Sequence, residues 1–575
     1  MAFERARSAS SARPVPSAPA LPPRPAAFAP RARRPRPASQ PGGQALPPSS
    51  TFRSRWLQPV DGGILVAALA AVGLLAFQLH QSNFLFGVIE YDDAVNLGAA
   101  VRLVHGALPY RDFVLMQPPG LPLLISPVAL LSRLTGTRDA MAIARLLTIV
   151  VAGGNVVLLG RLLRHRGAPA TFLGCTVLAA FSSAILTART FMLEPYLVLF
   201  CLIGAVACFE GDQLTSRRRR LILAGVAFGF AGSVKIWAIL PVVVIVVLCL
   251  PAVRRRALPF VWGVAAGFAV PCAPFFFAAP MRFVNEVIVV QLSRVTNARM
   301  PIGIRLEYLT GLYGSGLHLS RALVDATTIG IGLFVAGAFV VTQLSGSRLP
   351  LSRLEAFVLG SAAIVGLSLL VPTEFYYHYA DWFAPFLAGL ICLAAARWGR
   401  SAVSVAGWLG RTAGAGPRAG PNWPARVTAS VILLVGVGVL ASGGQFSKVN
   451  AAAAPDPGKV IEQHVPPGAC VLTDLTSQTL SASRMVSSDP SCPLLIDSFG
   501  TDLSLAGGRT LAAGGASVPA VQRRWLTYFE GARYVVLSSP HTARIPWTPA
   551  ITAYFATHFV RLKAPGVFLF ERIAA

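Results

Sequence analysis

The chain has 575 residues, of which 54% are hydrophobic and only 13% are charged, and its mean hydropathy is +0.61. Many apolar runs reach about 20 residues, the length of helix that crosses a hydrocarbon core of roughly 30 Å. This composition excludes a soluble globular protein and indicates a polytopic α-helical membrane protein. The net charge of +26 would favour nucleic-acid binding in a soluble protein. Here the arginine clusters fall between apolar runs, as in cytoplasmic loops, so we expect no nucleic-acid partner.

The first segment, residues 1–57, is rich in Pro, Ala, Ser and Arg and nearly lacks large apolar side chains. Such a segment cannot bury enough surface to offset its chain entropy, so we predict a disordered tail. It is too long and too rich in proline to be a typical cleaved signal peptide. Its basic character predicts a cytoplasmic N-terminus.

The apolar runs and basic loops together predict a transmembrane domain over residues 58–444. Placing the arginine-rich loops inside gives eleven spans, near residues 62–80, 140–160, 168–187, 193–209, 221–234, 237–252, 258–279, 324–344, 355–372, 380–397 and 427–444. The segment 118–132 is expected as a helix at the outer interface. The two spans at 221–234 and 237–252 are short, and short or broken helices are tolerated where they line a polar cavity.

After the last span, residues 445–575 form a different kind of sequence. Short strand-like runs such as ACVLTD, ARYVVLSS and GVFLFER alternate with turns, which predicts a small extracytoplasmic α/β domain. Two of the eight cysteines, Cys470 and Cys492, fall in this region, and the oxidising outer compartment makes them a candidate disulfide. The other six lie within or beside the spans, where lone cysteines usually pack.

Two adjacent carboxylates, Asp92 and Asp93, follow the first span in the stretch IEYDDAVNLG. Either one could cap the helix that begins there. Neighbouring side chains on a helix point about 100° apart, so the pair cannot both cap. Asp92 and Asn96 would share one face and form a polar spot at the membrane edge.

Two further ionisable residues occur where a membrane helix rarely carries them. Glu194 stands beside Pro195 at the outer start of a span, where an acid also suits the helix dipole. Lys235 is the only charge in a long apolar stretch, so it either snorkels to the outer interface or faces a cavity or a charged ligand such as phosphate.

Two outer segments supply further candidates for substrate binding. The loop 291–309 carries Arg294, Arg299 and Arg305, which suit a lipid phosphate or form a solvated face. The segment TEFYYHYADWF contains His378 and Tyr379 in an aromatic cluster, which suits either an interfacial belt or a carbohydrate or lipid-head site.

The order of these motifs resembles the polyprenyl-phosphate-dependent glycosyltransferases of the GT-C fold, and most closely the protein mannosyltransferase and aminoarabinose transferase group, family 39. The resemblance covers about residues 60–400. It rests on the acidic pair after the first span, the Pro-Pro element QPPGL, the acid that opens the fourth span, the following lysine and the basic outer loop. The chain departs from the family pattern at Asp93, where the family has Glu, and it lacks the family's His before Pro118.

The resemblance implies a role for each candidate. Asp92 would be the general base that activates an acceptor hydroxyl, and Asp93 would position the acceptor or the sugar. Glu194 would shape the acceptor side, while Lys235 and the loop arginines would hold the donor phosphate. A sugar on a lipid phosphate already has a good leaving group, so a base and cations suffice, and we predict inversion by a single displacement.

The expected partners are a lipid-linked sugar donor and a glycan, lipid or protein acceptor in the plasma membrane. A divalent cation at Asp92 and Asp93 is a further hypothesis, since acidic pairs can hold such ions with phosphate. Three alternatives stay open: a transporter or flippase, a polysaccharide polymerase or ligase acting on lipid-linked glycans, and a scaffold whose C-terminal domain binds cell-wall glycan. No duplicated pair of halves, which a transporter would favour, is visible in the sequence.

Overall fold

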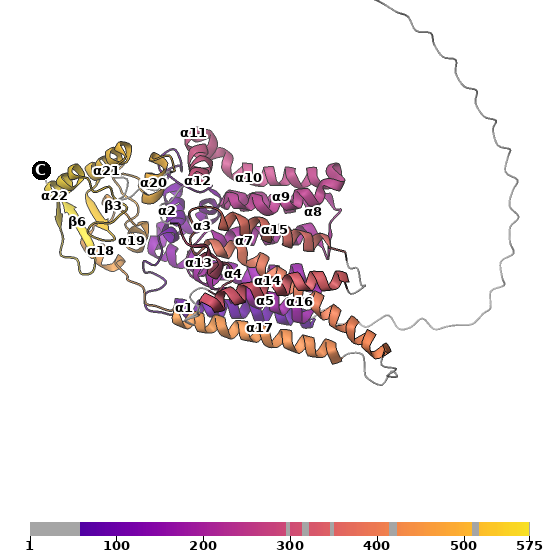
Figure 1. Ribbon diagram of the computed structural model, residues 1–575. Helices are drawn as coiled ribbons and strands as arrows, with labels where there is room; N and C mark the ends of the chain where they lie inside the picture. The colour runs from indigo at the N-terminus through magenta and orange to yellow at the C-terminus, as the bar shows by residue number, and fades with distance from the viewer. Residues whose placement is uncertain are drawn as a thin grey trace, which may run out of the picture. The chain divides into compact units, whose positions relative to one another are not determined.

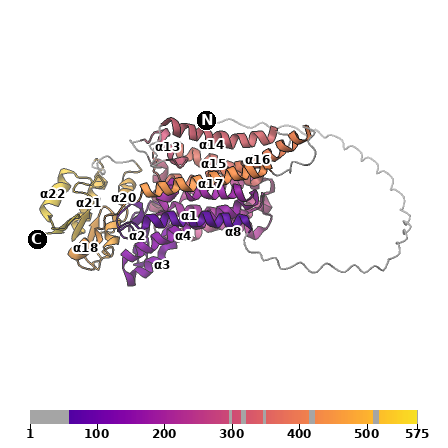
Figure 2. The same ribbon diagram turned by 90° about the horizontal axis from the view of Figure 1, so that it is seen from below.

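The computed structural model describes residues 58–294, 299–312, 321–344, 350–412, 423–508 and 517–573 of the chain. The predicted tail at residues 1–57 lies outside this part. The long helices pack against one another, for example α1, α5 and α17, and the C-terminal strands gather at one end of them beside α2 (Figure 1). Figure 2 shows α18, α20, α21 and α22 at that same end.

The membrane part is almost entirely helical. Its helices are α1 (Pro59–Leu79), α2 (Asp92–Val104), α3 (Gly120–Thr135), α4 (Thr137–Leu163), α5 (Ala168–Ala179), α6 (Ser182–Ala188), α7 (Glu194–Cys208), α8 (Arg218–Val234), α9 (Ile239–Cys249), α10 (Leu258–Ala278), α11 (Pro280–Val284), α12 (Val290–Ser293), α13 (Ile302–Leu309), α14 (Arg321–Leu344), α15 (Arg353–Leu370), α16 (Tyr379–Thr412) and α17 (Trp423–Val449). Short 3₁₀ and π turns connect several of them, and a two-stranded hairpin, β1 (Phe209–Glu210) and β2 (Gln213–Leu214), follows α7.

Each of the eleven predicted spans overlaps a helix or, for residues 168–187, the bent pair α5 and α6. Among the described residues, seven helices are long and apolar enough to cross a membrane, and eight if that pair, bent by 54°, counts as one span. The difference from eleven arises because α7 and α8 are short or carry arginines and because helical turns at 250–257, which include Arg254, Arg255 and Arg256, join α9 and α10 into one helical range. The chain is a multi-pass membrane protein, and the sidedness of its loops stays a prediction.

Helices α8 and α10 pack closely through two pairs of glycines. Gly225 and Gly229 of α8 face Gly263 and Gly267 of α10, and a Cβ atom added at any of the four would overlap backbone of the opposite helix. Glycines four positions apart lie on one helix face and let two backbones approach, a pattern common between membrane helices. The two helices therefore form one tightly joined wall.

The C-terminal region forms a small α/β domain, as predicted. Its four-stranded sheet has the order β3-β4-β6-β5, with β3 parallel to β4 and the other pairs antiparallel. The strands are β3 (Val471–Thr473), β4 (Tyr534–Leu537), β5 (Phe559–Arg561) and β6 (Phe568–Arg572), and the helices are α18 (Gly458–His464), α19 (Thr476–Ser481), α20 (Ser498–Leu505), α21 (Pro519–Gly531) and α22 (Pro549–His558).

Helices cover both faces of this sheet. Along β4, Val535 and Leu537 join a core with Trp525 and Phe529 of α21, while Val536 joins a second core with Ile461 of α18. A strand buried on both faces is apolar throughout, which explains the continuous apolar run of β4. Cys470 and Cys492 are joined in a disulfide.

The domain is fastened to the membrane helices by polar contacts. Thr137 Oγ1 donates to the carbonyl oxygen of Leu480 at 2.8 Å, and the Arg138 guanidinium holds Asp456 in a two-pronged ion pair with distances of 2.8 and 2.5 Å. Thr137 and Arg138 are the first two residues of α4, so the first turn of this helix holds the C-terminal domain against the membrane helices.

Candidate active site

A polar cavity of about 330 Å³ lies where α2, the start of α7, the segment before α16 and the C-terminal domain meet. We use the name polar cavity for the space lined by Glu90, Tyr91, Asp92, Val95, Asn96, Leu115, Met116, Gln117, Met192, Leu193, Lys235, Arg294, Tyr376, Tyr377, His378, Tyr379, Asp497, Phe499, Leu503 and Arg544. Five of the nine residues predicted to be catalytic or substrate-binding line it: Asp92, Lys235, Arg294, His378 and Tyr379.

Asp92 is the first residue of α2, and its side chain is 46% exposed to the cavity. Tyr91 is the N-cap residue, and no side chain caps this helix, so neither aspartate has the capping role that the sequence allowed. Asn96, one helical turn on, lines the same cavity, as the helical periodicity predicted. The Asp92 Oδ2 atom lies 3.6 Å from Nε2 of His378. Its carboxylate is therefore accessible and has one basic neighbour.

Asp93 points the other way and is fully buried. Its carboxylate receives a two-pronged ion pair from the equally buried Arg145, with Nε to Oδ2 at 3.1 Å, and the backbone N–H of Phe191 at 2.7 Å. Arg145 in turn donates to the carbonyl oxygens of Phe84 and Gly87. Asp93 thus fixes α2 against α4 and the segment before α7, and it does not line the cavity with Asp92.

In the cavity wall, Lys235 and His378 form a connected group with Glu194, which lies behind them. Glu194 Oε1 accepts from the Lys235 ammonium at 2.6 Å and from Nδ1 of His378 at 2.8 Å. A carboxylate only accepts, so Nδ1 of His378 carries the proton in this contact. His378 therefore bridges Glu194 and Asp92, and the three segments that carry these residues are held in one arrangement.

Lys235 sits where the helix of its segment is broken. α8 ends at Val234, Lys235 is extended, and a 3₁₀ turn follows at Ile236–Ala238. Its ammonium lies 3.8 Å from the ring centre of Trp237 and 4.5 Å from that of Tyr379. Aromatic faces and a carboxylate stabilise a cation away from water, which explains how a lysine is kept at this depth.

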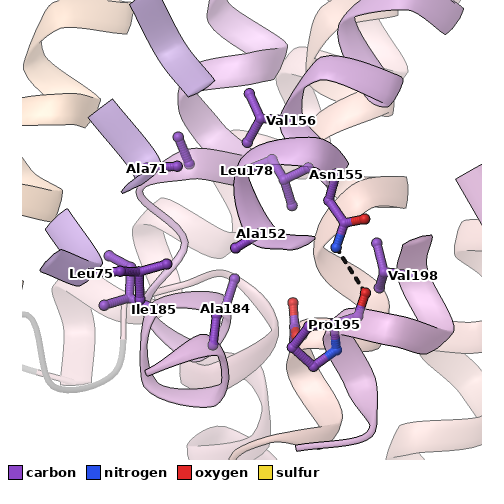
Figure 3. A pocket seen from close by; sticks show the side chains of 13 residues that line it. Ala71, Leu75, Ala152, Asn155, Val156, Leu178, Ala184, Ile185, Pro195 and Val198 are labelled. Atoms are coloured by element: carbon purple, nitrogen blue, oxygen red, sulfur yellow. Dashed lines mark hydrogen bonds between the residues drawn. The ribbon is translucent and has the colours of Figure 1, made fainter. Parts of the chain in front are cut away.

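The start of α7, which carries Glu194, is anchored from the opposite side. Asn155 of α4 donates from Nδ2 to the carbonyl oxygen of Pro195 at 2.9 Å (Figure 3). A small cavity of about 30 Å³ lies beside this bond and is lined mainly by apolar residues such as Ala71, Leu178 and Val198, with Asp381 at its edge. Glu194 is the first residue of α7, but no side-chain cap forms there. This contact sets the depth at which Glu194 meets Lys235.

The three arginines of the outer loop have separate places. Arg294 lines the polar cavity, pairs with Glu374 and lies over the rings of Tyr376 and Phe499 at 5.8 and 5.2 Å. Arg305 is buried and donates to the carbonyl oxygens of Leu369 and Leu370, the last two residues of α15, and of Pro372 and Thr373 just after it. Arg299 is exposed. The structure thus brings Arg294 to the cavity and leaves Arg299 and Arg305 out of it.

A second, apolar groove of about 650 Å³ adjoins the polar cavity. We use the name apolar groove for the space between α8, α9, α10 and α15 that is lined by residues including Phe228, Ile236, Val242, Val264, Phe268, Leu292 and Leu369. Arg294 and Tyr379 line both the groove and the polar cavity. An apolar channel therefore leads to a cationic and aromatic junction and from there to Asp92.

The C-terminal domain supplies cavity residues that sequence reasoning missed. Asp497 Oδ1 accepts from the Tyr91 hydroxyl at 2.8 Å and from the Gly500 N–H at 2.6 Å, and burial raises the pKa of Asp497 to about 6. Arg544 lies 4.8 Å over the Tyr91 ring and is held by Asp474 at 3.1 Å. These residues lie some 400 positions from Tyr91, and no local pattern marks them.

The predicted pairing of Asp92 and Asp93 around a divalent cation does not fit this geometry. Asp93 is occupied by Arg145, and within the described ranges no group of three or more His, Cys, Asp or Glu side chains is placed to hold a metal ion. A cation at this site would have to rely on Asp92 and groups of the substrate.

Comparisons with known proteins relate this arrangement to glycosyltransferases. A family model for dolichyl-phosphate-mannose-protein mannosyltransferase matches residues 133–278, a range that includes Glu194 and Lys235. A search of curated protein sequences finds no significant match.

The fold is similar to that of ArnT from Cupriavidus metallidurans. The crystal structure in the apo state gives a TM-score of 0.55 at 14% sequence identity, covering 90% of this chain and 99% of that one. The structure bound to undecaprenyl phosphate gives 0.51 at 16% identity, covering 90% and 98%. The archaeal oligosaccharyltransferase AglB from Archaeoglobus fulgidus gives 0.49 at 12% identity, covering 85% and 70%. The predicted resemblance to GT-C glycosyltransferases is confirmed.

Proposed function

We propose that this protein is a membrane glycosyltransferase that moves a sugar from a polyprenyl-phosphate donor to a hydroxyl group of a cell-envelope acceptor on the outer face. The observation that carries the proposal is the junction at Arg294 and Tyr379, where the apolar groove meets the polar cavity that contains Asp92 and Lys235. A lipid with a phosphate head has this division into an apolar chain and a charged end.

The donor would lie with its polyprenyl chain in the apolar groove. Its phosphate would then reach Arg294 and Lys235, the two cations that line the polar cavity next to the groove. Charge-assisted hydrogen bonds from guanidinium and ammonium groups are the strong contacts by which proteins hold phosphates. The structure of ArnT with undecaprenyl phosphate and the match to a family acting with dolichyl-phosphate-mannose support a donor of this class.

The reaction would be a single displacement. Asp92 takes the proton of the acceptor hydroxyl, whose oxygen forms a bond to the anomeric carbon as the bond from that carbon to the phosphate oxygen breaks. The lipid phosphate leaves with the electron pair, and Lys235 and Arg294 stabilise its negative charge. Attack opposite to the leaving group inverts the anomeric configuration. The accessibility of the Asp92 carboxylate, 46% exposed into the cavity, supports its role as the base.

His378 and Glu194 would link the two ends of the reaction. Glu194 fixes both the Lys235 ammonium and the His378 ring, and the other ring nitrogen faces Asp92. Groups oriented in advance at both the attacking and the leaving side cost no reorganisation when charge develops. In this arrangement Glu194 is a positioning residue.

The proposal is tested with the purified full-length chain in lipid nanodiscs. We would supply undecaprenyl-phosphate donors carrying mannose, 4-amino-4-deoxyarabinose or arabinofuranose, and measure released undecaprenyl phosphate and the anomeric configuration of the product by mass spectrometry and NMR. We expect cleavage of at least one donor with inversion. Cleavage of no donor in nanodiscs, together with movement of intact donor across the bilayer in sealed proteoliposomes, would overturn the proposal in favour of a flippase.

A matched pair of lysine variants controls this assay. Lys235→Met should reduce donor cleavage about 100-fold, because about 3 kcal/mol of leaving-group stabilisation is lost. Lys459→Met, which changes an exposed lysine of α18, should leave the rate unchanged. Equal rates for the two variants would contradict the placement of the donor phosphate.

A further inference from the structure

The end of the polar cavity formed by the C-terminal domain holds two polar side chains with unused hydrogen-bonding capacity. Asp497 is 7% exposed, and its Oδ1 receives the Tyr91 hydroxyl and the Gly500 N–H, whereas its Oδ2 accepts no hydrogen bond from the described residues. An accessible carboxylate oxygen that lines a cavity and receives no donor from the protein is free to accept a hydrogen bond from a ligand or from solvent.

Arg544 complements this carboxylate with donors. Its Nη1 atom donates to Asp474 at 3.1 Å and to Ser538 at 3.2 Å, while its Nε and Nη2 atoms make no hydrogen bond within the described part of the chain. Asp474 is itself fixed by the Ser538 N–H at 2.7 Å and the Thr542 hydroxyl at 2.8 Å. The guanidinium is therefore held in place by a built network, packed on Tyr91, with part of its donor set open.

The charge balance of the cavity distinguishes between possible ligands of this end. Each of the three cations in the wall has its own carboxylate, namely Lys235 with Glu194, Arg294 with Glu374 and Arg544 with Asp474. Asp92 has only His378 at 3.6 Å, and Asp497 is met by neutral donors. The side of the cavity that holds Asp92 and Asp497 is therefore negative on balance and disfavours an anionic group.

We propose that Asp497 and Arg544 form the acceptor subsite and that the acceptor presents a neutral, hydroxyl-rich sugar there rather than a phosphate or a carboxylate. The carboxylate accepts from one hydroxyl and the guanidinium donates to the oxygens of its neighbours. Phe499 and Tyr376, which line the same cavity beside Arg294, add aromatic surface that a sugar ring can contact. That the sugar bound here is the acceptor rests on the proposed function. The C-terminal domain would then select the group that is glycosylated.

Binding and turnover are measured separately, so that the subsite and the proposed function can fail independently. Wild-type protein in nanodiscs is tested by saturation-transfer NMR with four neutral probes, the octyl glycosides of mannose, glucose, galactose and arabinofuranose, and with octyl mannoside 6-phosphate. We expect at least one neutral glycoside to bind, and to bind at least tenfold more tightly than the phosphate. No binding of any neutral probe overturns the subsite whatever the donor assay gives. Preferential binding of the phosphate overturns it as well if that binding persists in Lys235→Met and Arg294→Ala, which remove the cations proposed for the donor phosphate.

Variants then locate the binding. We expect glycoside binding to weaken at least tenfold in each of three variants, Asp497→Asn, Arg544→Gln and Arg544→Lys. The lysine variant keeps the positive charge beside Asp474 but loses the planar set of guanidinium N–H donors, so it separates these two contributions. In the transfer assay they should raise the acceptor KM at least tenfold, a larger factor than the accompanying change in kcat. Asp489→Asn and Arg523→Gln, which change exposed residues of the same domain, are the matched controls.

Unchanged glycoside binding in the folded variants overturns the assignment. Equal loss of donor cleavage and acceptor binding overturns it as well, because such a loss indicates a general structural role. Retained binding of neutral glycosides in a protein that cleaves no donor would leave the subsite standing and remove only the proposed reaction. Folding of each variant is checked by its melting temperature and elution volume.

Discussion

Two ionic clusters lie at opposite ends of α7, and they are built differently. At the first residue of α7, Glu194 joins Lys235 and His378, and this group borders Asp92, whose side chain is half exposed to the polar cavity. Beyond the last residue of α7, Glu355 of α15 joins Arg166 and Arg397, and all three side chains are at most 2% exposed.

The second cluster leaves its carboxylate no capacity for a ligand. Glu355 Oε1 accepts from Arg166 and Arg397 at 2.9 Å each, and Oε2 accepts from Arg397 at 2.7 Å and from the Ser352 N–H at 2.9 Å, as part of a capping box that starts α15. The comparison teaches that buried charge alone does not identify a functional site. A cluster whose charges are all paired within the protein holds helices together, whereas one that keeps an accessible carboxylate can act on a ligand.

The largest effect on activity is expected at Asp92, the accessible carboxylate beside the cluster of Glu194, Lys235 and His378. Asp92→Asn keeps the size of the side chain but removes the base, so kcat should fall by about 10² to 10⁴-fold. The melting temperature should stay within about 2 °C of wild type, because this carboxylate is accessible and weakly paired. Donor cleavage by nanodisc-embedded protein measures the first quantity and thermal unfolding the second. Transfer at the wild-type rate in this variant would sink the assignment of Asp92 as the base.

The cluster of Glu355, Arg166 and Arg397 should show the reverse, a large loss of stability with little loss of activity. Glu355→Gln leaves the buried Arg397 without a carboxylate and Arg166 with Asp212 alone, which should reduce the free energy of unfolding by about 3–5 kcal/mol. Donor cleavage per folded molecule should remain within twofold, because α7 separates this cluster from the cavity. Denaturant titration in detergent and an activity assay normalised to folded protein check the two parts. A Glu355→Gln variant that is stable but inactive would contradict the distinction between a structural cluster at Glu355 and a functional one at Glu194.

Asp502 of the C-terminal domain allows the effect of burying a carboxyl group to be tested by varying the pH. Asp502 of α20 accepts from Trp525 Nε1 at 2.9 Å, and burial raises its pKa from 3.8 to about 8. The folded state therefore binds this proton more tightly than the unfolded state, so stability is full below about pH 4 and falls as the pH rises to about 8.

Asp502→Asn keeps an oxygen for Trp525 but removes the titration. We expect its apparent melting temperature to equal that of wild type at pH 4 and to exceed it by about 2–5 °C at pH 9. Scanning fluorimetry across this range measures the difference. A variant that is less stable than wild type at pH 9 would show that the ionised carboxylate is stabilised by a contact with a cation.

The smallest effect is expected at the loop arginines that lie outside the cavity. Arg299→Ala should change the donor KM less than twofold because this side chain is exposed. Arg294→Ala should raise the donor KM more than tenfold because Arg294 lines both the groove and the cavity. Donor titrations of the two variants sharpen the comparison within a single loop. Similar values would remove the distinction between them.

Much of the fold could be predicted because hydropathy is a local property. The apolar runs located all eleven helical ranges, and strand-like runs such as ARYVVLSS located β4. Spacing along a helix also placed Asp92 and Asn96 on one face. Lys235 could be predicted as a candidate residue because it is the only charge in a long apolar stretch, which is also a local property of the sequence.

The pairing of side chains could not be predicted, because it depends on the rotation and depth of each helix. Asp93 finds its partner Arg145 some 50 positions away, and Arg305 binds carbonyl groups at and just after the end of α15 in place of a phosphate. Asp497 and Arg544 reach the cavity only because a separate domain is seated there. None of these contacts leaves a signal in a single sequence.

The glycine-to-glycine packing of α8 and α10 has a consequence for how a long lipid could enter or leave. Both helices line the apolar groove, through residues such as Phe228 and Val264, and their backbones already touch at Gly225, Gly229, Gly263 and Gly267. Because their backbones are already in contact, a sliding or tilting movement between these two helices would disturb this packing. An opening of the groove towards the bilayer is therefore expected on its other side, where α15 contributes Ser368 and Leu369, and not between α8 and α10.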